Sequence, residues 1–183
     1  IHELWIGTET GVVLLDTRQQ RLTTPAEFLR TIGTAVKAIL TDDTGNVWIA
    51  TFGAGLYVYE TARNTLQHFT YDYNNPYSIS NNEVLSLFCD RSGIMWVGSN
   101  GLDKYNPRKE KFTLFDYVPY SREKLIFRNI HPIYDDGAGV LWVGSKSDGL
   151  HRLDRGHKQY QHITHQEGNP NSLASNHVRA IRE

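Results

Sequence analysis

Four tryptophans recur at nearly regular intervals along the 183-residue chain, and this repeat constrains the fold more than any other feature. The separations between Trp5, Trp48, Trp96 and Trp142 are 43, 48 and 46 residues. Spacing of one residue type can arise by chance, so the residues around the tryptophans have to agree in phase before a repeat is inferred.

The flanking residues do agree. An aspartate stands six residues before each of the last three tryptophans, a glycine stands three residues before, and a Gly-Leu pair follows within five to seven residues. The aspartates are Asp42, Asp90 and Asp136, and the preceding glycines are Gly45, Gly93 and Gly139. Agreement at this many positions indicates an internal structural repeat.

The second unit shows how each repeat is expected to fold. Its apolar pattern predicts strands over 36–40, 47–51, 56–60 and 65–71, with an Asp-x-x-Gly turn after the first strand. Four antiparallel strands in about 40–50 residues are typical of a propeller blade, which buries its faces against neighbouring blades. We therefore predict an all-β propeller of about four blades. The tryptophans fill the space between sheets, and the turn glycines are structural.

The repeat predicts a single propeller domain. Residues 177–183 match the opening strand of a further blade, and the segment from His177 to Arg182 is able either to fill the gap in the first blade and close a four-bladed ring, or to continue an arc of a larger ring. The expected units are 1–34 (a first blade without its opening strand), 35–82, 83–128, 129–176 and 177–183.

Three segments resemble the two-component regulator propeller repeat: Asp90–Leu102, Asp42–Tyr59 and Asp136–Leu150. The segments Asn75–Asn82 and Asn169–Asn176 are similar to the link between blades in the same family. Two segments depart from the pattern: 118–129 lacks the Asn-Pro element, and 25–35 is atypical.

The resemblance implies a cellular context. It places the chain in the periplasmic sensor region of a hybrid two-component histidine kinase from a glycan-utilising bacterium. Such a parent protein is expected to be membrane-anchored and homodimeric, to sense an oligosaccharide, and to carry its kinase and phosphorelay modules outside this chain. The chain begins with Ile1 and is interpreted as a piece of a longer protein, itself without catalytic activity.

Composition excludes some partners. With 19 Lys and Arg against 20 Asp and Glu, the chain has no basic excess that would favour nucleic acid. It also lacks an apolar run near the ~20 residues of a membrane span, so this segment is expected to make no membrane contact. Cys89 is the single cysteine and cannot form a disulfide within the chain.

Motifs of catalysis are nearly absent. A Ser-x-x-Lys match at Ser121–Lys124 lacks its partner motifs and is interpreted as a loop. The eight histidines show no metal-ligand spacing, and the Asp-rich turns lack the alternating oxygen ligands of a calcium loop, so neither a metal nor a cofactor is expected.

Binding is a better prediction than catalysis. The loops between the fourth and first strands are expected to share a face with those between the second and third strands, and such loops suit recognition. Asn75, Pro76, Asn81 and Asn169 are interpreted as turn formers. The alternatives left open are a scaffold for dimerisation and a propeller-type polysaccharide lyase or hydrolase. The candidate ligand-binding residues are Tyr73, Tyr77, Asn100, Tyr120, Arg122, Arg128, Lys146 and Asp148.

Overall fold

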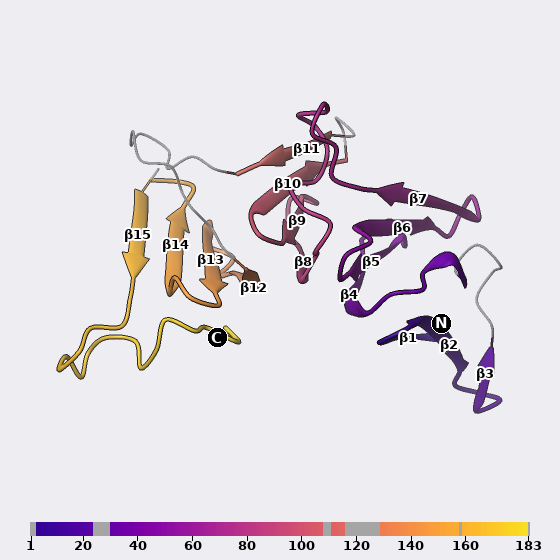
Figure 1. Cartoon of the computed structure of the whole chain (residues 1–183), viewed down its shortest axis with the longest axis horizontal. Coiled ribbons are helices and arrows are strands. Elements are labelled where there is room, and N and C mark those ends of the chain that lie inside the picture. Colours follow the sequence, from indigo (N-terminus) through magenta and orange to yellow (C-terminus); the bar gives the residue numbers. More distant parts are fainter. Residues whose placement is uncertain (1–2, 24–29, 108–110, 116–128, 158, 183) are drawn as a thin grey trace.

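The computed structural model describes residues 3–23, 30–107, 111–115, 129–157 and 159–182. In these residues fifteen strands form one three-stranded and three four-stranded antiparallel sheets, which confirms the predicted all-β propeller blades (Figure 1). The strands are β1 (Glu3–Thr8), β2 (Gly11–Asp16), β3 (Arg21–Thr23), β4 (Val36–Thr41), β5 (Val47–Thr51), β6 (Leu56–Glu60), β7 (Thr65–Phe69), β8 (Ser86–Cys89), β9 (Met95–Gly98), β10 (Leu102–Asn106), β11 (Lys111–Leu114), β12 (Ile130–Asp135), β13 (Val140–Ser145), β14 (Leu150–Asp154) and β15 (Gln159–Ile163). Among the described residues, no helix has the length and apolar character needed to cross a bilayer.

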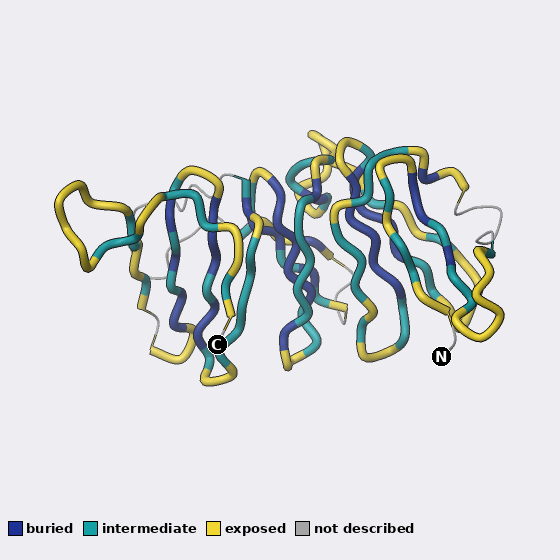
Figure 2. Tube along the Cα trace, turned by 90° about the horizontal axis from the view of Figure 1, so that it is seen from below, coloured by how far each residue is buried: buried dark blue, intermediate teal, exposed yellow. Residues whose placement is uncertain are grey.

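Every sheet is an up-and-down meander in which consecutive strands pair. The sheets fan out as an arc, with β4, β8 and β12 near the centre and β3, β7, β11 and β15 at the periphery (Figure 1). Contacts between β1 and β4, between β4 and β8, and between β8 and β12 join neighbouring sheets at this hub. Burial is greatest in the second strands of the four-stranded sheets, β5, β9 and β13, whereas the central strands β4, β8 and β12 are mostly half-buried and hairpin tips are exposed (Figure 2).

The core lies between the sheets as three separate apolar clusters. Trp48 is 3% exposed and packs in the cluster between the second and third sheets, where its ring meets Tyr105 edge-on. Trp96 is 2% exposed and belongs to the cluster between the third and fourth sheets. Trp5 packs on the cluster between the first two sheets. Trp142, on the outer face of the last sheet, is only half-buried.

Each tryptophan of the last three sheets is tied to its own turn. The indole nitrogens of Trp48 and Trp96 donate to Asp42 at 2.8 Å and to Asp90 at 3.0 Å, respectively. Asp136 likewise accepts a hydrogen bond from Trp142. The aspartate six residues before each tryptophan therefore both closes the turn and satisfies the buried indole N–H.

An ion-pair cluster fastens the third sheet to the fourth. Arg155, in the β14–β15 turn, donates to Asp90 at 2.9 Å and also to Asp135, while its Nε donates to the carbonyl of Gly139. The Asp90 and Asp135 side chains are 2% and 5% exposed. Burial raises the pKa of Asp90, but hydrogen bonds from Ser92, Trp96 and backbone amides outweigh it and leave that pKa below its usual value.

Close backbone approach at the hub requires small residues. A Cβ atom added at Gly98 would lie 2.7 Å from Ile130 Cγ2, and one at Gly144 would lie 2.7 Å from Val178 Cγ1. These glycines stand two residues after their tryptophans, so the repeat places them where the next stretch of chain crosses. Ala50 occupies the same place in the second sheet.

Residues 177–182 do not close the ring. The amide of Val178 donates to the carbonyl of Ser145, as Val84 does to Thr51 and Ile130 does to Ser99. The segment therefore follows the path of an opening strand beside β13, and in the described residues β1 pairs only with β2. Figure 1 shows it well separated from β1. Two arrangements were considered from the sequence. The structure does not adopt the four-bladed closure, because residues 177–182 lie beside β13 and not beside β1, and the sheets form an open arc.

Candidate functional site

Two links between sheets share one hydrogen-bonded scaffold. In the link over residues 70–82, the side chain of Asn82 accepts from the Tyr71 amide at 2.7 Å, and Ser78 accepts from the Asp72 amide at 3.1 Å. In the link over residues 164–176, Asn176 accepts from the His165 amide at 2.6 Å and Ser172 from the Gln166 amide at 2.9 Å. The backbone of the two links is therefore shaped by equivalent residues.

The asparagines that open each link are turn formers, as interpreted from the sequence. Asn75 accepts from the Tyr77 amide at 3.0 Å, and Asn169 accepts from the Asn171 amide at 3.0 Å. Asn81 similarly accepts from the amide two residues ahead. These side chains are engaged within the link itself, which leaves recognition to other residues.

Side chains presented by the two scaffolds differ at equivalent positions. The first link exposes Tyr71, Tyr73 and Tyr77, which are 48%, 86% and 51% accessible. The second link exposes His165, Glu167 and Asn171 in the same places. Lys111 lies 4.2 Å from the centroid of the Tyr77 ring, so one face of this tyrosine carries a cation. We call Tyr71, Tyr73 and Tyr77 the tyrosine link.

The tyrosine link is anchored to the third sheet by a buried carboxylate. Asp103 is fully buried, and its Oδ2 accepts from the amide and the hydroxyl of Ser80 at 2.9 and 2.8 Å. Its Oδ1 has no hydrogen-bond partner among the described residues. Burial raises the pKa of Asp103 to about 6 against the opposing effect of the Ser80 hydrogen bonds.

Links and second-to-third-strand turns meet on one edge of the arc. The amides of Gly53 and Gly55 donate to the carbonyl of Asn82, and that of Gly149 donates to the carbonyl of Asn176. Of the candidate binding residues in these turns, Asn100 and Lys146 are exposed and Asp148 is partly exposed. Tyr120, Arg122 and Arg128 lie outside the described residues, so the structure does not place them relative to the tyrosine link.

An open groove of ≈ 590 Å³ lies between the second and third sheets. Its wall includes Asp42, Trp48, Arg63 and Tyr105, which places it beside the turn that holds the indole. Asp42 already accepts hydrogen bonds from Trp48, Thr44 and backbone amides, so this wall is occupied largely by structural contacts.

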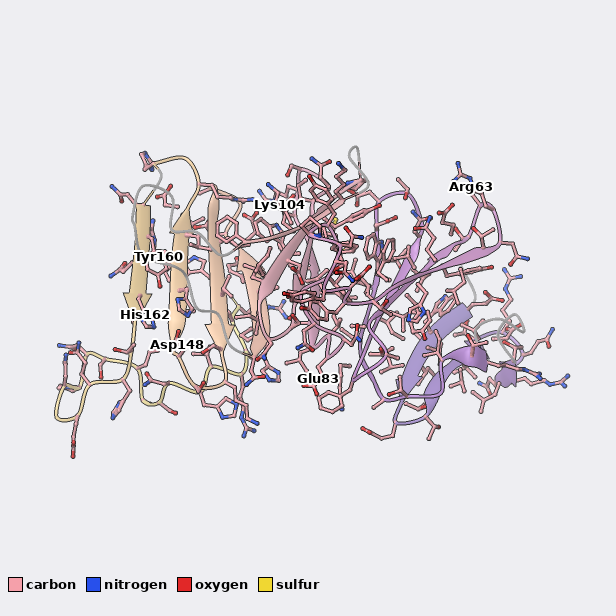
Figure 3. The ribbon with its side chains drawn as sticks, turned by 45° about the horizontal axis from the view of Figure 1, so that its top comes forward. Arg63, Glu83, Lys104, Asp148, Tyr160 and His162 are labelled. Carbon is pink, nitrogen blue, oxygen red and sulfur yellow. The ribbon has the colours of Figure 1, made fainter. Side chains whose placement is uncertain are left out.

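A cluster of ionisable side chains lies at the outer corner of the fourth sheet. Asp148 lies in the β13–β14 turn, and His151 and His162 are cross-strand partners on β14 and β15. One potential ligand atom from each residue lies within 4.8 Å of the others. Figure 3 shows Asp148 and His162 beside one another, with Tyr160 nearer the start of β15. We call Asp148, His151 and His162 the His-Asp corner.

The sequence predicted Asp148 as a binding residue but gave no role to His151 or Tyr160. The neighbours of His162 were not predicted either, because ring-to-ring contact depends on the register between β14 and β15. One signal was present: His162 follows Trp142 by the same 20 residues that separate His68 from Trp48.

Comparison with known proteins supports the architecture. A family model described as two component regulator propeller matches residues 78–101. Histidine kinase P4 of Formosa agariphila is 26% identical over 81% of this chain, which corresponds to 11% of that protein. The chain therefore spans about a tenth of this relative.

Solved structures with the same fold come from Bacteroides thetaiotaomicron. The extracellular domain of the putative one component system BT4673 aligns with a TM-score of 0.78 and 22% identity, over 99% of this chain and 23% of that one. The extracellular domain of the putative hybrid two component system BT3049 aligns with a TM-score of 0.72 and 23% identity, over 90% and 23% of the two chains. At these identities the likeness establishes the fold.

The phase of the sequence repeat, the stacked sheets and the matching family model all indicate a propeller architecture. Residues 78–101 match the two-component regulator propeller family model, and the chain that carries them has the propeller fold of these extracellular domains.

Proposed function

We propose that this chain is part of the periplasmic sensor region of a hybrid two-component signalling protein, where it binds an oligosaccharide and helps to pass the signal to a cytoplasmic histidine kinase. The matched repeat and the relative named as a histidine kinase support the signalling context. The extracellular domains with the same fold support a location outside the cytoplasm.

One observation carries the binding role: a constant link scaffold presents different side chains at equivalent positions. Residues that shape the backbone are alike in both links, whereas the outward residues are Tyr71, Tyr73 and Tyr77 in one and polar in the other. Loops held on a rigid frame with variable exposed residues are the usual location of recognition.

The tyrosine link suits a sugar ligand chemically. A phenol ring stacks its face on the apolar C–H face of a pyranose, and its hydroxyl bonds to sugar hydroxyls. Tyr73 is 86% exposed, so it is available to a ligand without rearrangement of the core. Asn100 and Asn74 add amide groups on the same edge of the arc.

The direct test is carbohydrate binding by the 183-residue chain and its variants. We expect calorimetric titration with oligosaccharides selected on a glycan array to show binding that Tyr73→Ala weakens at least about tenfold, since stacked aromatic anchors dominate such interfaces. Glu167→Ala changes the equivalent position of the other link and is the matched control, with affinity unchanged.

Two results would count against this role. Absence of binding across the array, with dimerisation retained, would favour the scaffold considered from the sequence. Turnover of a polysaccharide would favour the lyase or hydrolase. The signalling context is tested separately by the reading frame that contains this chain, in which we expect a membrane helix and a histidine kinase module downstream.

A further inference from the structure

We propose that the His-Asp corner is a binding site for a zinc-class divalent cation, with Asp148, His151 and His162 as the three protein ligands. This site lies on the fourth sheet, at the periphery of the arc and separate from the tyrosine link.

The carboxylate of Asp148 lies across both imidazoles. Its Oδ2 is 3.3 Å from Nε2 of His151, and its Oδ1 is 3.7 Å from Nε2 of His162. The two rings are stacked with centroids 4.6 Å apart and planes inclined by 5°. Both Nε2 atoms therefore lie at the same end of the stacked pair, next to one carboxylate.

The two separations between the Asp148 carboxylate and the histidine nitrogens are close to those of a filled site. Zinc binds imidazole nitrogen and carboxylate oxygen at roughly 2.0–2.2 Å, which sets tetrahedral ligand atoms roughly 3.3–3.5 Å apart. The stacked imidazoles direct their Nε2 lone pairs side by side, so this geometry is completed when the Asp148 and His162 side chains, which are 40% and 35% exposed, turn toward His151. Two imidazoles and one carboxylate select zinc and its transition-metal neighbours over magnesium or calcium.

His151 is already held in a ligand's orientation. Its side chain is 2% exposed, and Nδ1 lies 2.8 Å from the hydroxyl of Tyr160. In the metal-free chain His151 hydrogen-bonds with Asp148, which Nε2 faces. When Nε2 binds a cation, the ring proton lies on Nδ1 and is donated to Tyr160.

The second sheet contains the same corner without two of the ligands. His68 corresponds to His162: it stacks on Tyr57 with centroids 4.0 Å apart, and its Nε2 contacts the carbonyl of Ala54. His162 makes the same contact with the carbonyl of Asp148. A histidine on the outer strand is thus a repeated structural feature, whereas Asp148 and His151, in place of Ala54 and Tyr57, are particular to the fourth sheet.

Metal binding has a definite structural consequence. Nε2 of His162 exchanges its carbonyl contact for coordination, and the cation then joins the β13–β14 turn to the outermost strand. The exposed side of Asp148 and His162 provides an entry path and leaves a fourth coordination position for water or an oxygen of a ligand.

The test is titration of the metal-stripped 183-residue chain with Zn²⁺ by calorimetry and with Co²⁺ by visible absorption. We expect one site, with the intense d–d bands of four-coordinate cobalt. Asp148→Ala and His151→Tyr copy the residues of the second sheet, and each should weaken Zn²⁺ binding more than tenfold. Tyr160→Phe should have a smaller effect in the same direction, because it removes only the partner of Nδ1.

His68→Ala is the matched control, because it removes the equivalent histidine of the second sheet and should leave Zn²⁺ affinity unchanged. Circular dichroism spectra and melting curves of all variants, recorded without metal, establish that each is folded. The proposal is overturned if the wild-type chain binds no Zn²⁺, or if folded Asp148→Ala and His151→Tyr variants bind it as tightly as the wild type does.

Discussion

One buried strand position carries a different residue in each four-stranded sheet. Tyr57, Asp103 and His151 all pair with a residue of the outermost strand: His68, Leu114 and His162, respectively. The position is aromatic in the second sheet and a carboxylate in the third, where Asp103 is fully buried. A buried carboxylate opposes folding when it is ionised, so Asp103 lowers the free energy of unfolding at neutral pH. Its structural role is to hold Ser80 in place.

Asp103→Asn should stabilise the chain at neutral pH. The folded pKa of about 6 lies above the ordinary value of 3.8, so the protonated group favours folding below pH about 4, and this contribution is lost as the pH rises through 6. The shift corresponds to up to about 3 kcal/mol. An amide oxygen still accepts from Ser80, and no charge is buried.

Urea denaturation at several pH values between 4 and 7.5 checks this prediction. The difference in unfolding free energy between Asp103→Asn and the wild type should grow in favour of the variant as the pH rises. Parallel curves across this range would show that Asp103 titrates in the folded chain as it does in the unfolded one.

At the scale of elements, single hairpins join neighbouring sheets. The β14–β15 turn supplies Arg155, which reaches Asp90 of the preceding sheet as well as Asp135 of its own. The corresponding β6–β7 turn supplies Arg63, which pairs with Glu60 of the same hairpin and is 77% exposed. Arg155 therefore makes a contact between two sheets, whereas Arg63 makes a contact on the surface of one sheet.

Arg155→Ala should destabilise the chain by about 2 kcal/mol, because it leaves two buried carboxylates without their cation. Arg63→Ala makes the same change at an exposed pair and should cost less than about 1 kcal/mol. Chemical denaturation of both variants measures the difference. Equal losses would mean that Arg155 does not fasten the third sheet to the fourth.

The elements themselves were largely readable from the sequence. Strands predicted over 47–51 and 56–60 coincide with β5 and β6, since alternation and turn residues act locally. The bond between Asp42 and Trp48 was not predicted, although its spacing was seen, because the spacing does not show which way a side chain points. The His-Asp corner was missed because it depends on cross-strand register.

Differences in turn length also explain why counting residues from the tryptophan misaligns one strand position between sheets. Asp103 follows Trp96 by seven residues, whereas Tyr57 follows Trp48 by nine, because β10 begins six residues after Trp96 and β6 begins eight residues after Trp48. Counting from the tryptophan therefore aligns Tyr57 with Tyr105, but pairing in the sheet aligns it with Asp103. Only the register reveals that a carboxylate occupies this buried place.

At the scale of the molecule, the arc exposes more surface than a compact protein does. Its accessible area is 11309 Å², against about 9,000 Å² for a globular monomer of the same mass. The outer faces of the first and last sheets account for part of this excess: Leu4 and Leu22 are 52% and 62% exposed, and Trp142 is half-buried.

Small-angle scattering of the 183-residue chain should report this open shape. We expect a radius of gyration clearly above the roughly 16 Å of a compact domain of this length. The molar mass measured on the same sample by light scattering verifies that a monomer is observed. A monomer near 16 Å would indicate the closed four-bladed ring.

The glycines that stand two residues after their tryptophans allow adjacent sheets to approach closely at the hub. Gly98 and Gly144 leave no room for a methyl group against Ile130 and Val178 at the narrow end of the fan. A larger side chain at either position would push the strands apart at the hub and would change the angle between adjacent sheets. The spacing of adjacent sheets at the hub thus depends on the side chain at one position per repeat, which is Ala50, Gly98 or Gly144.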